Sequence, residues 1–596
     1  TDGGNSWQVI SPDLTRNDRS RMTISGGLTP DNIGVEYAGV VFAITESAKE
    51  PGLLWAGTND GLVWVKRGNG EWTNVTKNIP GLPEWLTVSN IEASRWDAGT
   101  AYISVDGHQM NNRDPWIYRT NDYGRTWTRI TNGIPPSMLS YVHCVREDAV
   151  RRGMLYAGTE NGLYISFNDG ANWQPLQNNL PHSPVYWIAN QERFHDLALA
   201  TYGRGFWILD DVSPFQQLTP DVLNAAAHLF APRDAYRYRD ITHPAAPFYD
   251  PTAGNNPPYG ADLNIYLKAP LASDQKAKIT ISDAAGKVVR TIACSPARAD
   301  VAKSTGPEIP EEMGGTPKPQ PPSTTPGSEQ PATLAPLGPT TAEAKAQPVQ
   351  GERACELKAG INRYWWDLGS DYTTEMHLRT PPFYVPDYPM GPQGWRNAPV
   401  LGRMNLLVPP GTYTVKLTVG DKDYESHKIN VIKDPHSTGT EADIQAQTQF
   451  VTGLMQQYES LSLTINQVES VRAQLNNVVR ELVNNDVGKQ IRTSAQQLND
   501  KLVGVESKLL QMRLTGHGQD DVRWPPMIMQ KIAYLASEAS SSDFAPTTQQ
   551  VQVAQLLKQQ GDEAQRDIQQ IMSSDVTSFN QMLGQHNIAG IIAKAP

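Results

Sequence analysis

The chain has 596 residues, which is too long for one hydrophobic core and predicts about three or four domains. Its formal net charge of −11 disfavours nucleic acid and anionic membrane surfaces as partners. No apolar run reaches the roughly 18 residues of a transmembrane helix, and the 47 Gly and 45 Pro indicate a soluble, turn-rich chain.

Residues 1–218 contain short runs of β-branched and aromatic residues separated by Gly, Asn and Asp, a pattern typical of strands and turns. The runs fall into four units of four, beginning with VVFAITES, LLWAGT, GLVWVKR and WTNVT and ending with VYWIAN, LALATY, GFWILDD and FQQL. Four short strands per unit predict the blades of a β-propeller. One further strand begins the chain, so we expect the missing blades on a preceding segment or on another chain.

A turn motif, (S/T)-x-D-x-G-x-x-W, follows the third run of these units. It is complete in RTNDYGRTW, carries Asn for Asp in SFNDGANW, and is cut short in the opening TDGGNSW. Its polar side chains can bond the turn backbone while the Trp fills the gap between sheets, which predicts a structural and not a catalytic role. The residues assigned to this motif are Asp2, Gly4, Trp7, Thr120, Asp122, Gly124, Trp127, Ser166, Asn168, Gly170 and Trp173.

These boxes, together with GTNDGLVWV, GTENGLYIS and TYGRGFWILDD, resemble the BNR/Asp-box superfamily. Within it they look like the bacterial sortilin-type proteins that are often labelled "glycosyl hydrolase". The resemblance is strong over residues 1–218 and looser elsewhere. It implies a β-propeller and an extracellular, periplasmic or cell-surface location, but the motif specifies a fold and leaves the function open.

The strand order places the loops between second and third runs on the face opposite the boxes, where loops on a rigid scaffold often carry function. An inverting glycosidase would need two carboxyls about 6.5–9.5 Å apart there, although NDG and ENG are also ordinary hairpin turns. The candidate catalytic carboxylates are Glu36, Asp60, Asp106 and Glu160. The candidate ligand-binding residues are His108, Arg113, Tyr202, Arg204 and Trp85. Arg204 has a structural alternative, an ion pair with Asp210 or Asp211.

Residues 219–436 alternate apolar and polar side chains around Gly and Asp turns, which predicts an Ig- or fibronectin-like β-sandwich. A Pro-rich insertion at residues 295–350 interrupts it. Cys294 and Cys355 flank that insertion, and they are either a disulfide or two free buried thiols. No Cys/His spacing predicts a metal site, and no cofactor motif is present. An aromatic- and Pro-rich stretch before residue 411 is long enough to pack back against the propeller.

Residues 437–596 have few Gly and Pro and carry apolar residues at helical spacing, which predicts a bundle of antiparallel helices. Taken together, these patterns predict a mainly β chain with an α-helical C-terminal domain, made of a partial propeller, a sandwich and a bundle. It favours an exported, non-enzymatic binding or scaffolding protein for a glycan or protein ligand. The alternative is a glycoside hydrolase that cuts a polysaccharide with a carboxylate pair on the propeller face.

Overall fold

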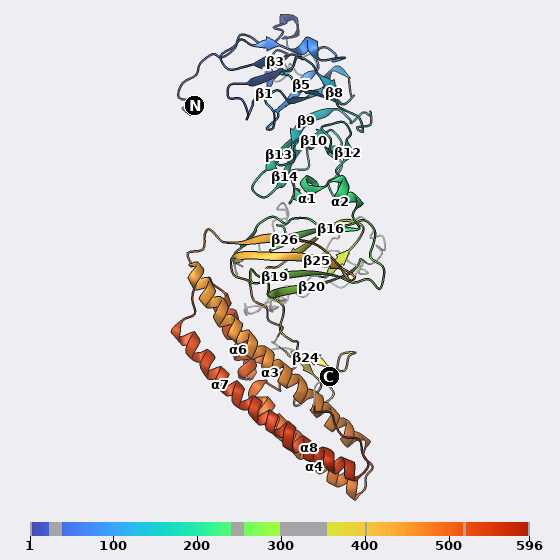
Figure 1. Ribbon diagram of the computed structural model, residues 1–596, viewed down its shortest axis with the longest axis vertical. Coiled ribbons are helices and arrows are strands. Elements are labelled where there is room, and N and C mark those ends of the chain that lie inside the picture. Colours follow the sequence, from blue (N-terminus) through green and yellow to red (C-terminus); the bar gives the residue numbers. More distant parts are fainter. Residues whose placement is uncertain are drawn as a thin grey trace, which may run out of the picture. The chain divides into compact units, whose positions relative to one another are not determined.

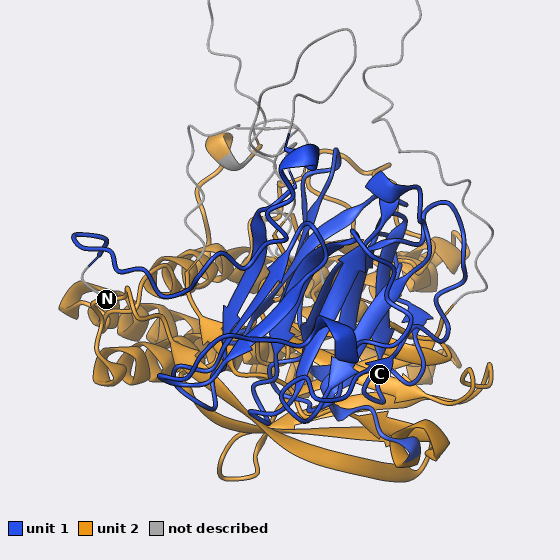
Figure 2. Ribbon diagram, turned by 90° about the horizontal axis from the view of Figure 1, so that it is seen from above, with its two compact units in different colours: residues 1–220 blue, residues 221–596 orange. Residues whose placement is uncertain are grey.

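The computed structural model describes residues 3–22, 38–239, 256–297, 354–399, 402–516 and 520–593. The chain forms two compact units, residues 1–220 and 221–596, which are coloured separately in Figure 2. Most of the predicted Pro-rich insertion, from residue 298 onward, lies outside the described residues.

The first unit consists of successive antiparallel sheets in which the strands follow chain order (Figure 1). Three sheets have four strands and one has three. The first sheet holds β1 (Val41–Glu46), β2 (Leu54–Thr58), β3 (Val63–Lys66) and β4 (Thr73–Asn74). The second holds β5 (Thr87–Ala93), β6 (Ala101–Asp106), β7 (Trp116–Thr120) and β8 (Thr128–Arg129). The third holds β9 (Val142–Glu147), β10 (Leu155–Thr159), β11 (Gly162–Ser166) and β12 (Gln174–Pro175), and the last holds β13 (Val185–Gln191), β14 (Asp196–Thr201) and β15 (Phe206–Leu209).

Neighbouring sheets contact each other through their first strands, β1 with β5, β5 with β9 and β9 with β13. The side chains alternate between two faces, so each inner sheet buries residues against both neighbours. Ile103 and Val105, for example, pack toward the first sheet, whereas Tyr102 packs toward the third. The period-two pattern of the sequence thus sets which sheet each side chain faces.

The turn from Thr120 to Trp127 is held by its own polar side chains. The hydroxyl of Thr120 donates to Asp122 Oδ1 (2.8 Å) and accepts from the N–H of Gly124 (2.9 Å). Asp122 also accepts from the backbone N–H and hydroxyl of Thr126 (2.9 and 2.6 Å). Trp127 is 6 % exposed and meets Trp55 of the preceding sheet edge to face, with ring centres 6.0 Å apart. The turn therefore joins two sheets.

The turn from Ser166 to Trp173 keeps this geometry although Asn168 replaces the Asp. The N–H of Gly170 donates to Ser166 Oγ (3.0 Å), and Asn168 Oδ1 accepts from the N–H of Asn172 (2.9 Å). In the other turn, the two oxygens of Asp122 accept from the N–H and from the hydroxyl of Thr126. Asn172 occupies the Thr126 position and has no hydroxyl, so the single amide oxygen of Asn168 is enough to accept its N–H. Trp173 is 4 % exposed and donates to the carbonyl of Ile130 in the preceding sheet region (2.7 Å).

The opening turn differs from these two. Asp2 lies outside the described residues, and Gly4 has the positive φ of 86° that the turn needs. Trp7 is 89 % exposed, because no sheet precedes β1 among the described residues to receive it.

The predicted fourth strand of the last unit, FQQL, is wrong. Phe215 and Gln217 lie instead in helix α1 (Ser213–Gln217). Pro214 sits in the first turn of that helix, where its fixed φ favours helix and its missing N–H costs nothing.

The outer face of the last sheet is apolar and uncovered. Alternate residues place two cross-strand rows on it. One row is Trp187, Ala200 and Phe206, and the other is Ala189, Ala198 and Ile208. Trp187, Phe206 and Ile208 are 49, 85 and 63 % exposed, whereas the opposite face of the same strands is buried against the third sheet.

The second unit begins with α2 (Pro220–Asn224) and two sheets that share one core. A three-stranded sheet has the order β16 (Ala227–Leu229), β18 (Ala261–Leu267), β22 (Gly360–Trp366). A six-stranded sheet has the order β17 (Ala235–Arg237), β26 (Lys422–Lys433), β25 (Gly411–Val419), β19 (Ala277–Ser282), β20 (Val288–Pro296), β21 (Cys355–Leu357). A disulfide joins Cys294 to Cys355, which are register partners on parallel β20 and β21.

The helical region is divided into several helices. Its helices are α3 (Glu441–Glu481), α4 (Asp486–Leu509), α5 (Asp520–Arg523), α6 (Ile528–Ser540), α7 (Thr548–Gln570), a π-turn (Ile571–Asp575) and α8 (Val576–Gln585). Thr440 and Asp443 form the capping box that starts α3. Apolar side chains from α3, α4, α6, α7 and α8 build one continuous core.

The aromatic- and Pro-rich stretch, which includes β23 (His377–Leu378) and β24 (Arg396–Asn397), lies along α3 of its own unit. Buried Glu469 accepts the N–H and hydroxyl of Thr380, both at 2.7 Å. Arg472 bridges Glu469 and Glu506 at 2.6 and 2.8 Å, so charged groups link this stretch to the core of the bundle.

These observations confirm a mainly β chain of antiparallel strand groups with an α-helical C-terminal region. Among the described residues, no helix is both long enough and apolar enough to cross a membrane.

Candidate functional site

Several predicted site residues meet at the edge of the first unit where β6 and β10 end. Asp106 ends β6, His108 lies in the short 3-10 helix that follows (His108–Met110), and Glu160 lies in the β10–β11 turn. Tyr141 immediately precedes β9 and His143 is the second residue of that strand. β9 contacts both β6 and β10. These five residues are called the histidine cluster below.

Strand register explains why the cluster forms. Val142 on β9 pairs with Thr159 on β10, so His143 stands next to the turn that carries Glu160. β6 packs against β9, which brings Asp106 to the other side of the same imidazole. His143 is 6 % exposed and is therefore part of the wall between two sheets.

His143 lies between two carboxylates. Its Nε2 is 2.9 Å from Glu160 Oε2, and its Nδ1 is 3.5 Å from Asp106 Oδ2. Asp106 Oδ1 in turn accepts from the backbone N–H of His108 (2.9 Å) and lies 2.7 Å from the Nδ1 of the same residue. Each carboxylate is thus committed to a histidine ring.

Aromatic rings extend this cluster toward solvent. His108 stacks on Tyr141 at 5.1 Å between ring centres, and Tyr141 meets His143 edge to face at 5.3 Å. His143 stacks on Tyr186 of β13 at 4.0 Å, and Tyr186 lies 5.7 Å from Tyr202. Tyr186 and Tyr202 are 45 and 73 % exposed, so the row ends as an open aromatic surface.

The electrostatics match these contacts. Burial raises the pKa of Asp106, but hydrogen bonds from His143 and then from His108 outweigh it and hold that pKa below its ordinary value. Burial and a hydrogen bond to Glu160 raise the pKa of the Tyr141 hydroxyl. Asp106 is therefore a carboxylate at neutral pH, and Tyr141 is a neutral donor. No group of His, Cys, Asp and Glu in the described part of the chain has the arrangement of a metal site.

One arginine lies over a ring of the aromatic row, and a second follows its last tyrosine in the chain. The guanidinium carbon of Arg113 lies 5.3 Å from the centre of the Tyr141 ring, and its buried Nε has no hydrogen-bond partner. Arg204 follows Tyr202 in the β14–β15 turn and is exposed. Asp210 and Asp211 both make contacts, among them a hydrogen bond from the backbone N–H of Asp211 to Asp196 Oδ1 (2.9 Å), and an ion pair of Arg204 with either carboxylate stays a prediction.

The remaining candidates lie elsewhere. Glu36 is outside the described residues. Asp60 is 1 % exposed and accepts from the hydroxyl of Thr58 and from the N–H of Arg16 (2.7 Å), so it serves as a structural acceptor. Trp85 is covered by Arg16 and Arg21, whose guanidinium carbons lie 4.8 and 4.2 Å from its ring centre. Neither Asp60 nor Trp85 belongs to the histidine cluster.

Tyr141, His143 and Tyr186 were missed in the sequence analysis, because all three lie in or beside segments whose pattern predicts only β-strands. One signal was present in YVHCVRE, since a His at the loop end of a first strand interrupts an otherwise apolar run.

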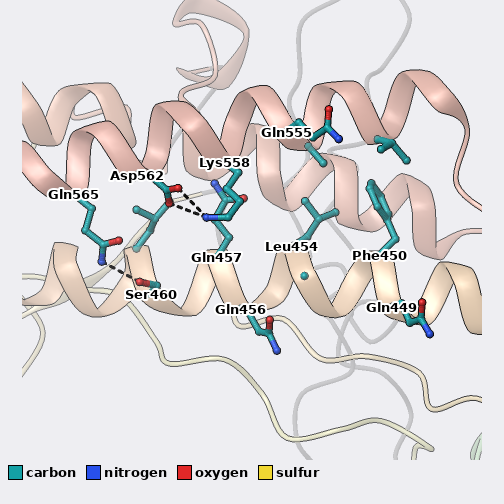
Figure 3. A pocket seen from close by; sticks show the side chains of 14 residues that line it. Gln449, Phe450, Leu454, Gln456, Gln457, Ser460, Gln555, Lys558, Asp562 and Gln565 are labelled. Atoms are coloured by element: carbon teal, nitrogen blue, oxygen red, sulfur yellow. Dashed lines mark hydrogen bonds and ion pairs between the residues drawn. The ribbon is translucent and has the colours of Figure 1, made fainter.

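A second hollow lies in the helical region, between α3 and α7 (Figure 3). It encloses about 480 Å³, with Phe450, Leu454 and Ala554 among its apolar lining. Two of its five glutamine amides are occupied, since Gln457 donates to the carbonyl of Leu557 (2.9 Å) and Gln565 donates to two hydroxyls of α3. Lys558 and Asp562 pair along α7, so the hollow holds no group prepared for acid–base chemistry.

Comparison with known proteins gives weak similarities only. No family model matches the chain, and no curated protein matches it. Among solved structures, the GH74 xyloglucanase from Xanthomonas campestris is 16 % identical, with a TM-score of 0.24, over 45 % of this chain and 39 % of that protein. A GH74 enzyme from Niastella koreensis is 14 % identical, with a TM-score of 0.23, over 44 % of this chain and 37 % of that one. The chain thus spans well under half of either enzyme, and such scores do not identify its fold or activity.

Proposed function

We propose that the first unit is a carbohydrate-binding module and that the histidine cluster with Tyr186 and Tyr202 is its ligand site. The observation that carries this proposal is the continuous row of rings from His108 to Tyr202, bordered by the carboxylates of Asp106 and Glu160.

A sugar ring presents C–H groups on its faces and hydroxyls around its edge. Exposed tyrosines offer flat apolar surface with a polar tip, which suits the faces. Carboxylates accept from hydroxyls, and imidazole and guanidinium N–H groups donate to them, which suits the edge. The site combines both kinds of group on one rigid set of strands, as small-molecule sites commonly do.

Hydrolysis is the alternative function, and the geometry favours it less. An inverting pair needs room for a water molecule and the scissile bond between the carboxyls, and one acid needs a raised pKa. Here the imidazole of His143 fills the space between Asp106 and Glu160, and the pKa of Asp106 is lowered. Asp60 is already bonded, by Thr58 in its own loop and by the backbone N–H of Arg16.

We further propose that the sheets of this unit are Asp-box blades of a β-propeller, of the sortilin-like kind that the boxes resemble. Strands in chain order within each sheet, four in three sheets and three in the last, and contacts between successive first strands support it. The uncovered face with Phe206 and Ile208 supports a role for that face in receiving a further sheet, from another segment or chain. The Ig-like sheets and the bundle would then act as support or assembly domains, with boundaries near residues 218 and 436.

The disulfide supports an exported location, because such bonds persist in oxidising compartments. The proposal is therefore an extracellular, periplasmic or cell-surface binding protein without a cofactor, whose ligand is a glycan.

Affinity electrophoresis in gels that contain soluble polysaccharides, paired with a reducing-end assay, tests this function. Tyr202→Ala should weaken retardation about tenfold or more, whereas Tyr534→Ala should not. Tyr534 is a matched control, since it is 68 % exposed on α6. No retardation by any glycan, or equal loss in the two variants, would reject the binding site. Release of reducing ends that disappears in Asp106→Asn or Glu160→Gln would establish the hydrolase instead.

A further inference from the structure

Beyond a glycan in general, we infer that this site takes an acidic glycan, one whose sugars carry carboxylates. The inference rests on the proposed carbohydrate-binding function. It concerns charge selection by Arg113 and Arg204, the two cations at the ends of the aromatic row.

Arg113 is the stronger of the two observations. Guanidinium groups have five N–H donors, and buried donors are almost always bonded. The Nε of Arg113 is buried without a partner while the guanidinium lies over Tyr141, and no ion pair joins it to a carboxylate within the described ranges. The terminal nitrogens of the same guanidinium also have no protein partner among the described residues, so a ligand carboxylate can pair with them and compensate the charge.

The two carboxylates of the histidine cluster do not pair with Arg113. Asp106 and Glu160 lie on opposite nitrogens of His143, and Asp106 also bonds His108. Their charge is thus turned inward to the imidazoles, and Arg113 stays available to a ligand. Both carboxylates would still repel an anion that came between them, so the acidic group must lie outside the cluster, at its arginine ends.

Arg204 is the second cation of the proposed site. It adjoins Tyr202, which is 73 % exposed, in a turn where Gly203 and Gly205 both have positive φ, of 80° and 69°. A sugar stacked on Tyr202 would therefore place its edge next to this guanidinium. Ring contacts run from Arg113 through buried Tyr141 and His143 to the exposed rings of Tyr186 and Tyr202, and Arg204 follows Tyr202 in the chain.

The test uses the full chain and a panel of uronate polysaccharides, each paired with its carboxyl-reduced form. The reduced form keeps the linkages and ring shape and carries a neutral hydroxymethyl group in place of each carboxylate. We expect at least one acidic member to bind about tenfold or more tightly than its reduced partner, because one charge-assisted hydrogen bond contributes about that factor. The preference should shrink as ionic strength rises.

Variants locate the selectivity. Arg113→Gln and Arg204→Gln should each cut the preference for the acidic form severalfold, by weakening binding of the acidic form more than binding of the reduced form. Arg125→Gln, in the exposed turn at the opposite edge of the sheets, is the matched control and should change neither. Thermal unfolding checks that all three variants remain folded.

The outcomes separate the two levels of the proposal. If reduced forms bind as tightly as acidic ones, or if neither arginine variant alters the preference, the charge selection is wrong and the carbohydrate site stands. If the wild-type chain binds no member of the panel in either form and no neutral polysaccharide, both are wrong.

Discussion

The buried tryptophans of the turns give a sharp test of what holds the first unit together. Trp173 is 4 % exposed, and its indole N–H donates to the carbonyl of Ile130 at 2.7 Å. Replacement by Ala removes the side chain that fills the gap to the preceding sheet and leaves that carbonyl without its donor. Trp7 occupies the equivalent motif position but is 89 % exposed.

Burial decides the expected magnitudes. A buried Trp→Ala replacement costs about 3–5 kcal/mol, which is a large part of the roughly 5–15 kcal/mol that stabilises a domain. Trp173→Ala should therefore lower the midpoint of thermal unfolding of this unit by about 6–20 °C, at roughly 2–4 °C per kcal/mol for a unit of this size. Trp7→Ala should change the free energy of unfolding by less than about 0.5 kcal/mol, as exposed replacements usually do.

Urea denaturation followed by far-UV circular dichroism measures both variants, because this signal does not depend on the deleted indole. Trp127→Ala serves as a second buried case, at 6 % exposure. The reasoning is refuted if Trp173→Ala costs less than about 1 kcal/mol, or if Trp7→Ala is as damaging. A structural role for the turns also requires that folded Trp127→Ala protein still binds its glycan.

Three further predictions concern other parts of the chain. Replacing Cys294 and Cys355 by Ala should cost about 4 kcal/mol of stability in the second unit, since the bond closes a loop of 61 residues. Midpoints of urea unfolding with and without reductant check this prediction. An unchanged midpoint would contradict it. Burial, and then the charge of neighbouring Glu469, raise the pKa of Glu506, so its contribution to stability is complete below the unfolded pKa near 4.5 and is lost as pH rises toward the folded value. The stability of the wild type should accordingly fall relative to that of Glu506→Gln as the pH rises above 4.5, and parallel pH profiles would show that this carboxyl does not titrate there. Phe206→Ser combined with Ile208→Ser should change the free energy of unfolding by less than about 0.5 kcal/mol, because both side chains are exposed. The same double variant should reduce self-association, measured by light scattering. A loss of stability above about 2 kcal/mol would mean that the face is buried.

Local patterns in the sequence predicted most of the secondary structure. The strands of the first unit and the helices after residue 440 match the predicted runs, since alternation of apolar residues and helical spacing each encode which face is buried. FQQL was wrong because Pro214 starts a helix there, a local signal that outweighed the repeat.

The candidate site was predictable only in part. Asp106, His108, Arg113 and Glu160 lie in turns, where polar residues stand out from the strand pattern. Asp60 lies in an equivalent turn but its carboxylate is taken by Thr58 and Arg16, and only the packing of the segment around residue 16 decides that.

By itself the sequence determined the succession of sheets and helices, the anchoring turns and the edge at which loops carry polar groups, because these depend on neighbours a few residues apart. The tertiary structure alone decided that His143 stands between Asp106 and Glu160, and that Tyr186 and Tyr202 continue its ring stack. Those contacts join residues 16 to 43 positions apart, and strand register and sheet packing, which no local pattern specifies, bring them together.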